Sequence, residues 1–162
     1  MSLIELMIAM VVLAVGVIGS ASLLAVAMGG NDRSRQQSNA TVIAQMVTEK
    51  ISSVKATTSP DLTVTDCAGN SLTISTAGPA GETVTSAGAI DYTAAIVTNY
   101  QMNYVDCGNG GQQKTYDVRW NIQQPTGYVK LLTVSAKLRG SATDPKFFSL
   151  PVTVRTLVGQ GT

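Results

Sequence analysis

The chain has 162 residues and a formal net charge of +1, so charge gives no argument for nucleic acid or a membrane surface as a partner. It contains no histidine and only two cysteines, which leaves too few ligands for a zinc site of the usual type. The length allows one soluble domain beside a long apolar segment. The residue combinations that enzymes commonly use for acid–base and nucleophilic catalysis are missing. We therefore expect no catalysis, no cofactor and no bound metal.

The first predicted element is an apolar helix over residues 1–30. Residues 6–31 include no charged side chain, and most are Leu, Ile, Val, Met or Ala. A helix rises about 1.5 Å per residue and a bilayer core is roughly 30 Å thick, so this segment is long enough to span a membrane. The alternative is a signal peptide ending at the Ala-Val-Ala of residues 25–27, but such peptides begin with basic residues, whereas Glu5 stands here. We therefore expect no cleavage at that point.

Glu5 is an ionisable residue inside the apolar leading end of this segment. Such a group is costly in a membrane-length segment, and by default it marks a function. The alternative is local, because Ser2 and Glu5 have the spacing of a capping box, in which the glutamate caps its own helix. Further along, Gly16 and Gly19 each weaken the helix by about 1 kcal/mol relative to alanine. They allow close approach of another helix, mark a place where this helix stretches, or are simply tolerated.

An amphipathic helix is predicted over residues 31–55. If it continues the first helix, the combined helix is roughly 80 Å long. Pro60 ends it, because residues before a proline disfavour the helical region. Asn39-Ala40-Thr41 fits the N-glycosylation sequon, which makes Asn39 a candidate modification site. The apolar positions that recur at helical spacing are Ala40, Ile43, Ala44, Val47, Ile51 and Val54.

Residues 56–91 are rich in Thr, Ser, Gly and Ala and are predicted to form an exposed, variable loop. Alternating runs at residues 62–64 and 72–74 indicate one weak hairpin, and the Gly-Pro-Ala-Gly of residues 78–81 indicates a turn. Cys67 and Cys107 each follow a predicted strand end. In an exported, oxidising setting they would pair and close a loop of about 40 residues, which contributes roughly 4 kcal/mol. Two buried free thiols are the alternative.

Residues 92–162 are predicted to form an antiparallel sheet. Strands are expected over about residues 94–105, 116–122 and 132–138, with a turn at residues 125–127. A last strand is expected over about residues 148–156, and Pro151 indicates that it lies at an edge of the sheet or is bulged. The predicted fold class is therefore α+β, with a long N-terminal helix whose amphipathic half packs on a C-terminal antiparallel sheet.

The charges divide along the chain, because those between residues 61 and 106 are all acidic and bases dominate beyond them. Two solvated faces of one domain explain this division. A second interpretation is that acidic and basic faces of neighbouring copies meet, since complementary potentials fix the register between partners. The acidic residues are Asp61, Asp66, Glu82, Asp91 and Asp106, and the later bases are Lys114, Arg119, Lys130, Lys137, Arg139, Lys146 and Arg155.

The start of the chain, Met1-Ser2-Leu3-Ile4-Glu5-Leu6 followed by a long apolar run, resembles the type IV pilin family. That family includes the minor pilins and the pseudopilins of type II secretion, and the resemblance covers about the first thirty residues. It implies that Met1 is the N-methylated terminus left by prepilin peptidase. It also implies that Glu5 pairs with the terminal amine of a neighbouring subunit in the fibre core. The mid-chain cysteines depart from the family pattern, whose disulfide loop lies near the C-terminus.

By this resemblance the chain is a structural subunit of a cell-surface filament made of identical subunits. It would be inserted in the inner membrane before assembly and would meet the pilus assembly machinery there. A minor pilin or pseudopilin that primes or modifies the fibre is one alternative, and an adhesion or DNA-uptake subunit is another. For DNA uptake, Arg119, Lys137 and Arg139 of the basic sheet would contact phosphates.

Overall fold

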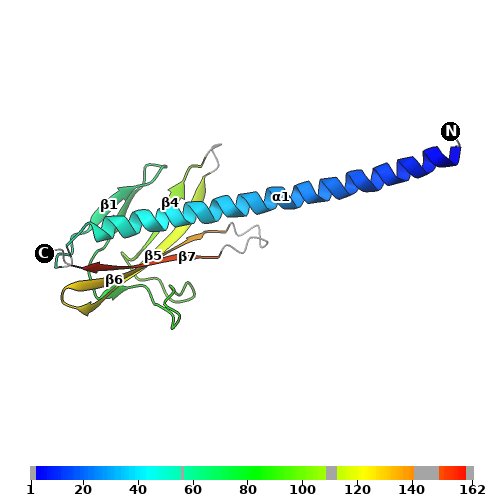
Figure 1. The fold of residues 1–162 in the computed structure, drawn as a ribbon. Coiled ribbons are helices and arrows are strands. Elements are labelled where there is room, and N and C mark those ends of the chain that lie inside the picture. Colours follow the sequence, from blue (N-terminus) through cyan, green and yellow to red (C-terminus); the bar gives the residue numbers. More distant parts are fainter. Residues whose placement is uncertain (1–2, 56, 109–112, 141–149, 160–162) are drawn as a thin grey trace. The chain divides into compact units, whose positions relative to one another are not determined.

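The computed structural model describes residues 3–55, 57–108, 113–140 and 150–159 (Figure 1). They form a long N-terminal helix and a C-terminal antiparallel sheet, so the predicted α+β fold class is confirmed. The chain divides into two compact units, residues 1–36 and residues 37–162. The elements in chain order are α1 (Leu3–Ser52), β1 (Leu62–Thr65), β2 (Ser71–Ile74), β3 (Ala80–Gly81), β4 (Gln101–Asp106), β5 (Lys114–Thr126), β6 (Val129–Leu138) and β7 (Val152–Gly159).

Helix α1 is continuous over 50 residues because the sequence offers no proline between Leu3 and Ser52. Glu5 in its first turn and Lys50 in its last turn both suit the helix dipole. The helix ends slightly before the predicted residue 55. Its last turn tightens there, since the Val54 N–H donates to the Ile51 carbonyl at 3.2 Å.

The main sheet contains five strands, and all of its pairings are antiparallel. Strand β5 lies at the centre, where it pairs with β3, β4 and β6, while β6 also pairs with β7. Strand β7 therefore lies at an edge, which is one of the two arrangements that Pro151, just before the strand, had indicated. Strands β1 and β2 form a separate two-stranded sheet in which Leu62 lies opposite Ile74, which confirms the predicted hairpin.

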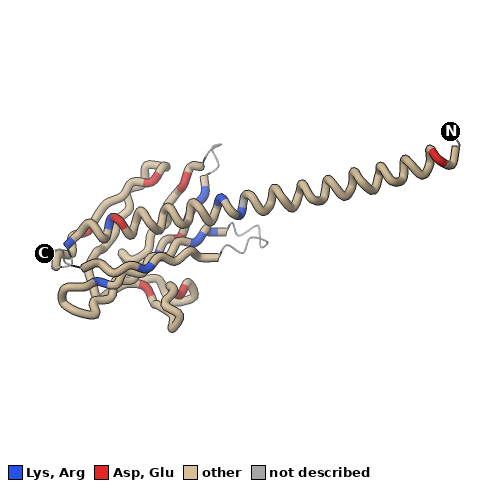
Figure 2. Tube along the Cα trace, in the orientation of Figure 1, with Lys and Arg blue, Asp and Glu red and all other residues tan. Residues whose placement is uncertain are grey.

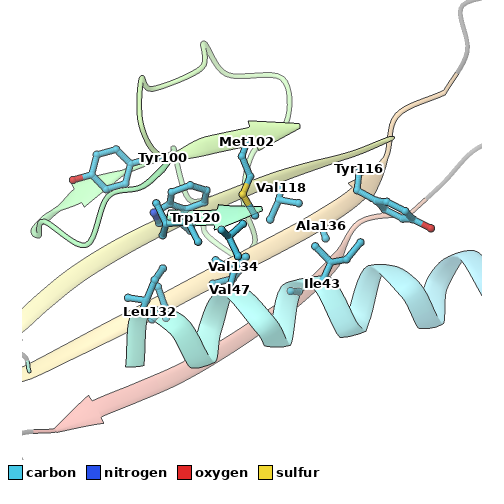
Figure 3. Close-up of a cluster of buried hydrophobic side chains, with 14 of the residues drawn as sticks. Ile43, Val47, Tyr100, Met102, Tyr116, Val118, Trp120, Leu132, Val134 and Ala136 are labelled. Atoms are coloured by element: carbon cyan, nitrogen blue, oxygen red, sulfur yellow. The ribbon is translucent and has the colours of Figure 1, made fainter. Parts of the chain in front are cut away.

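The core of the second unit lies between residues 40–51 of α1 and one face of the main sheet (Figure 3). Ala40 and Ala44 are 3% and 0% exposed, so small side chains bring this part of the helix close to the strands. Burying each larger apolar side chain contributes about 1.5–3 kcal/mol. The sheet residues of this core are Met102 of β4, Tyr116, Val118, Trp120 and Ile122 of β5, and Leu132, Val134 and Ala136 of β6.

Two predicted turns are wrong in detail. Residues 78–81 form a bend with a cis Gly78–Pro79 peptide and then strand β3, which pairs with β5. Gly81 has a φ of 132°, and a Cβ there would lie 2.5 Å from the Cα of Asn121, so only glycine fits. The turn predicted at residues 125–127 lies at residues 127–128, because strand β5 continues to Thr126. A register shift between Gln123 and Thr126 accommodates Pro125 within the strand.

The other face of the sheet is also covered, which the prediction of an exposed loop over residues 56–91 missed. Within the predicted loop, Glu82 is fully buried and Ile90 is 4% exposed. Thr133 and Ser135 of β6 alternate with the core residues of that strand and so point to this other face, yet they are only 2% and 0% exposed. The first sheet strand was predicted from residue 94 but begins at Gln101. We call the face opposite the helix the outer face.

Three consecutive carbonyls after β2 accept hydrogen bonds from side chains of the sheet region. Trp120 Nε1 donates to the Ser75 carbonyl at 3.0 Å, and Lys130 Nζ donates to the Thr76 carbonyl at 3.2 Å. The Tyr100 hydroxyl donates to the Ala77 carbonyl at 2.8 Å. Burial lowers the pKa of Lys130, whose ammonium also reaches the Thr58 carbonyl. These bonds fix the chain between the hairpin and β3.

Removing one of these donors is expected to destabilise the domain measurably. Tyr100→Phe keeps the ring but leaves the Ala77 carbonyl without its donor, at a cost of about 1–2 kcal/mol. Thermal unfolding of the detergent-solubilised chain, followed by fluorescence of the sole tryptophan, Trp120, measures the change. Tyr128→Phe is the matched control, because Tyr128 is 69% exposed and its change should be near zero. Equal effects of the two substitutions would contradict this role for Tyr100.

Candidate assembly site

The first unit contains a helical stretch whose large apolar side chains are all exposed. Residues 6–31 contain no charged side chain. Figure 2 shows this as a long uncharged length of the helix between the acidic position near its N-terminus and the first basic positions. Among the described residues, α1 is long and apolar enough to cross a membrane, and none of its most apolar window is buried. The exposed residues include Leu3, Ile4, Leu6, Met7, Ile8, Met10, Val11, Val12, Leu13, Val15, Val17, Ile18, Leu23, Leu24, Val26 and Met28.

These exposed side chains surround the helix instead of forming one stripe. Consecutive residues such as Met10, Val11, Val12 and Leu13 are each 62–70% exposed, and consecutive helical residues point about 100° apart. One partner helix would cover a single stripe of such a surface. Lipid on every side, or several neighbouring helices, is needed to cover all of it.

Glu5 lies in this stretch as an exposed residue of the first helical turn. Within the described part of the chain, no hydrogen bond or ion pair is recorded for its carboxylate. Met1 and Ser2, the predicted processing site and the predicted capping partner, lie outside the described residues. In lipid or among apolar helices, a lone carboxylate needs an opposite charge or hydrogen-bond donors from another molecule.

Gly16 and Gly19 are helical, and a Cβ at either position would meet nothing within 4 Å. The described part of the chain therefore gives no packing reason for glycine at these positions. Ser20 donates to the Gly16 carbonyl and Ser22 to the Gly19 carbonyl, both at 2.8 Å. Serine bonds of this kind satisfy the hydroxyl in an apolar medium and often bend helices. Stretching of the helix at residues 16–22 stays a prediction.

A disulfide joins Cys67 to Cys107, so the predicted pairing is confirmed. Their Cα atoms lie 5.8 Å apart, and their sequence separation is 40. The bond connects the turn after β1 to the end of β4, and thereby fastens the hairpin to the main sheet. Both cysteines come from strand ends that the alternating sequence pattern had indicated.

Asp66 makes a second connection at the same place. Its Oδ1 accepts from the N–H groups of Ala68 and Asn70, and its Oδ2 accepts from the Asn70 side chain and the Val105 N–H. Burial opposes ionisation of this carboxyl, but these hydrogen bonds outweigh burial and hold its pKa below the ordinary value of 3.8. The hairpin turn is therefore closed by an ionised carboxylate as well as by the disulfide.

This lowered pKa makes the contribution of Asp66 pH-dependent. A carboxyl whose pKa falls on folding stabilises the folded state above its unfolded pKa, and the contribution is lost as the pH falls through the lower, folded pKa. Asp66→Asn should therefore be less stable than the wild type at pH 6, because its amide faces the N–H donors of Val105 and Asn70. The difference should shrink below about pH 3.8.

Urea unfolding at pH 6 and at pH 2.5 measures that difference. Asp61→Asn is the control, since Asp61 is exposed and no hydrogen bond is recorded for it among the described residues. A difference between Asp66→Asn and the wild type that is the same at both pH values would contradict the role of the carboxylate.

Asn39, the candidate glycosylation site, lies within α1 and not on a loop. Its Nδ2 donates to Oδ2 of Asp106 at 2.7 Å, which ties the helix to the end of β4. Attachment of a sugar at Nδ2 would disrupt this bond, so the geometry does not favour modification of the folded chain. Thr41 of the sequon is also engaged, because its hydroxyl donates to the Gln37 carbonyl.

An ionic cluster on the outer face was not predicted. Arg119 donates through Nε and Nη2 to the carboxylate of Asp117 at 3.0–3.2 Å, and lies 4.8 Å from the Tyr92 ring centre. Burial opposes the charge of Arg119, but its bonds to Asp117 outweigh this and raise its pKa. Burial also raises the pKa of Tyr92. The Asp117-x-Arg119 spacing, which puts both residues on one face of a strand, is the signal that could have indicated the pair.

Burial corrects one interpretation of the charge pattern. The acidic and basic residues are not all solvated, because Glu82, Arg119 and Lys130 are 0%, 6% and 3% exposed. Of the three residues predicted to contact DNA phosphates, Arg119 is buried and its guanidinium is bonded to Asp117. The contacts predicted for Lys137 and Arg139 stay predictions.

The fold and the apolar stretch of α1 define the class of protein. It is a chain with one α+β domain and one exposed apolar helical stretch that carries a carboxylate in its first turn. Comparisons with protein-family models, with curated proteins and with solved structures give no match to this chain. Its function is therefore inferred from its residues and their geometry.

Proposed function

We propose that the chain is a structural subunit of a helical surface filament of the type IV pilus class, assembled by packing of residues 1–30 from many copies. The observation that carries this proposal is the carboxylate of Glu5, which has no partner among the described residues and lies on a helix that is apolar on all sides. A soluble domain needs no such helix, and a simple membrane anchor needs no carboxylate in its leading turn.

The filament supplies what both features lack. Several neighbouring helices cover an all-round apolar surface, as lipid does before assembly. A neighbour's terminal amine supplies the opposite charge for Glu5, since a charge buried alone is expensive and a hydrogen-bonded pair reduces the cost. The contact between copies is head-to-tail and does not close, which generates a filament.

In this proposal the chain is held in the inner membrane by residues 1–30 until it is processed at Met1 and transferred to the growing fibre. No catalytic role is assigned to it. Two roles are compatible with this proposal. The chain forms most of the fibre, or it primes the fibre as a minor pilin or pseudopilin, and its abundance in the filament distinguishes the two.

The test is to shear surface filaments from the native source and identify their subunits by mass spectrometry. We expect this chain in the filament fraction, with a methylated Met1 at its terminus. A reconstruction by electron microscopy should place residues 3–28 at the filament axis. Recovery of the chain from the membrane fraction alone, with no filament that contains it, would refute the proposal. Abundance distinguishes a major subunit from a trace component.

A further inference from the structure

Glu82 and Arg119 lie close together on the outer face without a direct hydrogen bond. The distance between Glu82 Oε2 and Arg119 Nη1 is 3.8 Å, and the side chains are 0% and 7% exposed. An N–H···O hydrogen bond extends to about 3.2 Å, so this contact is too long to be one. Both atoms are buried and have no hydrogen-bond partner among the described residues. Buried charged atoms left in this way are costly.

Glu82 is held at three points, once through its carboxylate and twice through its backbone. Its Oε1 accepts from the Val97 N–H at 2.9 Å. Its backbone N–H donates to the Trp120 carbonyl at 2.9 Å, and its carbonyl accepts from Asn121 Nδ2 at 2.8 Å. These bonds restrain the backbone of Glu82 and one oxygen of its carboxylate, and so limit where Oε2 can lie.

Arg119 is held just as firmly on its other side. Its Nε and Nη2 donate to the Asp117 carboxylate, and its guanidinium lies over the ring of Tyr92. Because the guanidinium is planar and rigid, this arrangement fixes the direction of Nη1. The 3.8 Å separation is therefore set by two independent groups of contacts.

We propose that one internal water molecule bridges Glu82 Oε2 and Arg119 Nη1. Two atoms 3.8 Å apart share positions about 2.8 Å from both, which is an ordinary hydrogen-bond length. Water fits because it donates to the carboxylate and accepts from the guanidinium. The guanidinium repels a cation and the carboxylate repels an anion, so neither kind of ion suits the site.

Asn121 lies beside Glu82 and carries a third such atom. Its Oδ1 is also buried without a partner in the described part of the chain, and its amide nitrogen donates to the backbone carbonyl of Glu82 at 2.8 Å. Buried waters typically make about three hydrogen bonds to polar groups that would otherwise be unsatisfied. Through this water the segment that contains Glu82 and Val97 is fastened to β5. The site does not depend on the proposed filament role.

A crystal structure of the full chain in detergent, at about 1.6 Å resolution, tests the proposal. We expect a density peak about 2.6–3.2 Å from both Glu82 Oε2 and Arg119 Nη1. Direct contact between these two atoms with no peak beside them would overturn the proposal. An anomalous signal at the site after a bromide soak would also overturn it, because the ligand would then be an anion.

Two variants show whether the carboxylate holds the water. Glu82→Met removes the acceptor at similar length, so the peak should disappear, and a peak that persists would overturn the proposal. Thr133→Val is the control: Thr133 is a buried residue of the outer face, and this nearly isosteric change should leave the peak in place. If Glu82→Met does not fold, the wild-type crystal still decides the question.

Discussion

Glu5→Ala is expected to abolish filament assembly while leaving the domain of residues 37–162 folded. In the proposed fibre the substitution leaves a neighbour's terminal amine buried without its opposite charge. Breaking a buried ion pair by removing one partner costs about 3–5 kcal/mol, so filament yield should fall by at least about a hundredfold. Sheared filaments quantified by electron microscopy and immunoblotting measure the yield. The unfolding midpoint followed by Trp120 fluorescence should not change.

Glu49→Ala is the matched control for this substitution. It removes the same side chain from the same helix, but Glu49 is exposed and lies in the second unit, after the apolar stretch. We expect filament yield close to that of the wild type. Glu5→Gln distinguishes charge from shape, because it keeps the length and removes the charge, and it should fail as Glu5→Ala does. Normal filaments from either Glu5 variant would contradict the pairing and leave helix capping as its role.

Much of the fold was predictable because its periodic patterns are strong. Ala40, Ile43, Ala44, Val47 and Ile51 recur at helical spacing, and all five are buried against the sheet. The alternating residues of β5 and β6 likewise supply the core. An amphipathic pattern identifies a buried face directly, since it depends only on local repeats.

The covered outer face was not predictable in the same way. Glu82 is one acidic residue in a Ser- and Thr-rich stretch, and nothing near it in sequence indicates that Arg119 will lie beside it. Its burial depends on long-range placement of the chain across β5. The strand pattern there shows one apolar and one polar face, which predicts a solvated outer face. A charged pair buried on the polar face gives the same pattern.

The assembly site illustrates a different limit. The exposed apolar stretch and Glu5 are visible in the sequence, and the structure adds that both lack a partner within the described chain. What covers them lies in other molecules, so one chain's sequence and structure can indicate the site without containing it. Gly16 and Gly19 are a similar case, because their neighbours within the chain leave room for larger side chains.

The disulfide should have the second large effect, on stability instead of assembly. It closes a loop across a sequence separation of 40, and the chain-entropy relation gives about 4 kcal/mol for a loop of that size. The double substitution Cys67→Ser/Cys107→Ser should therefore lower the thermal midpoint by about 10–15 °C for a domain of this size. Asp66 would still connect the hairpin to the Val105 N–H, so the domain should remain folded at room temperature.

Reductant provides the control for this double variant. Treating the wild type with dithiothreitol should reproduce the loss, whereas the serine variant should not respond to it. If the assembly site is confined to residues 1–30, filaments should still form at 20 °C, and they should dissociate or lose their domains' structure at lower temperature than the wild type. A stable double variant that cannot form filaments would instead place part of the assembly contact at the hairpin. That outcome would show that the disulfide acts in assembly and not only in stability. The Glu5 variants make the corresponding distinction between assembly and folding.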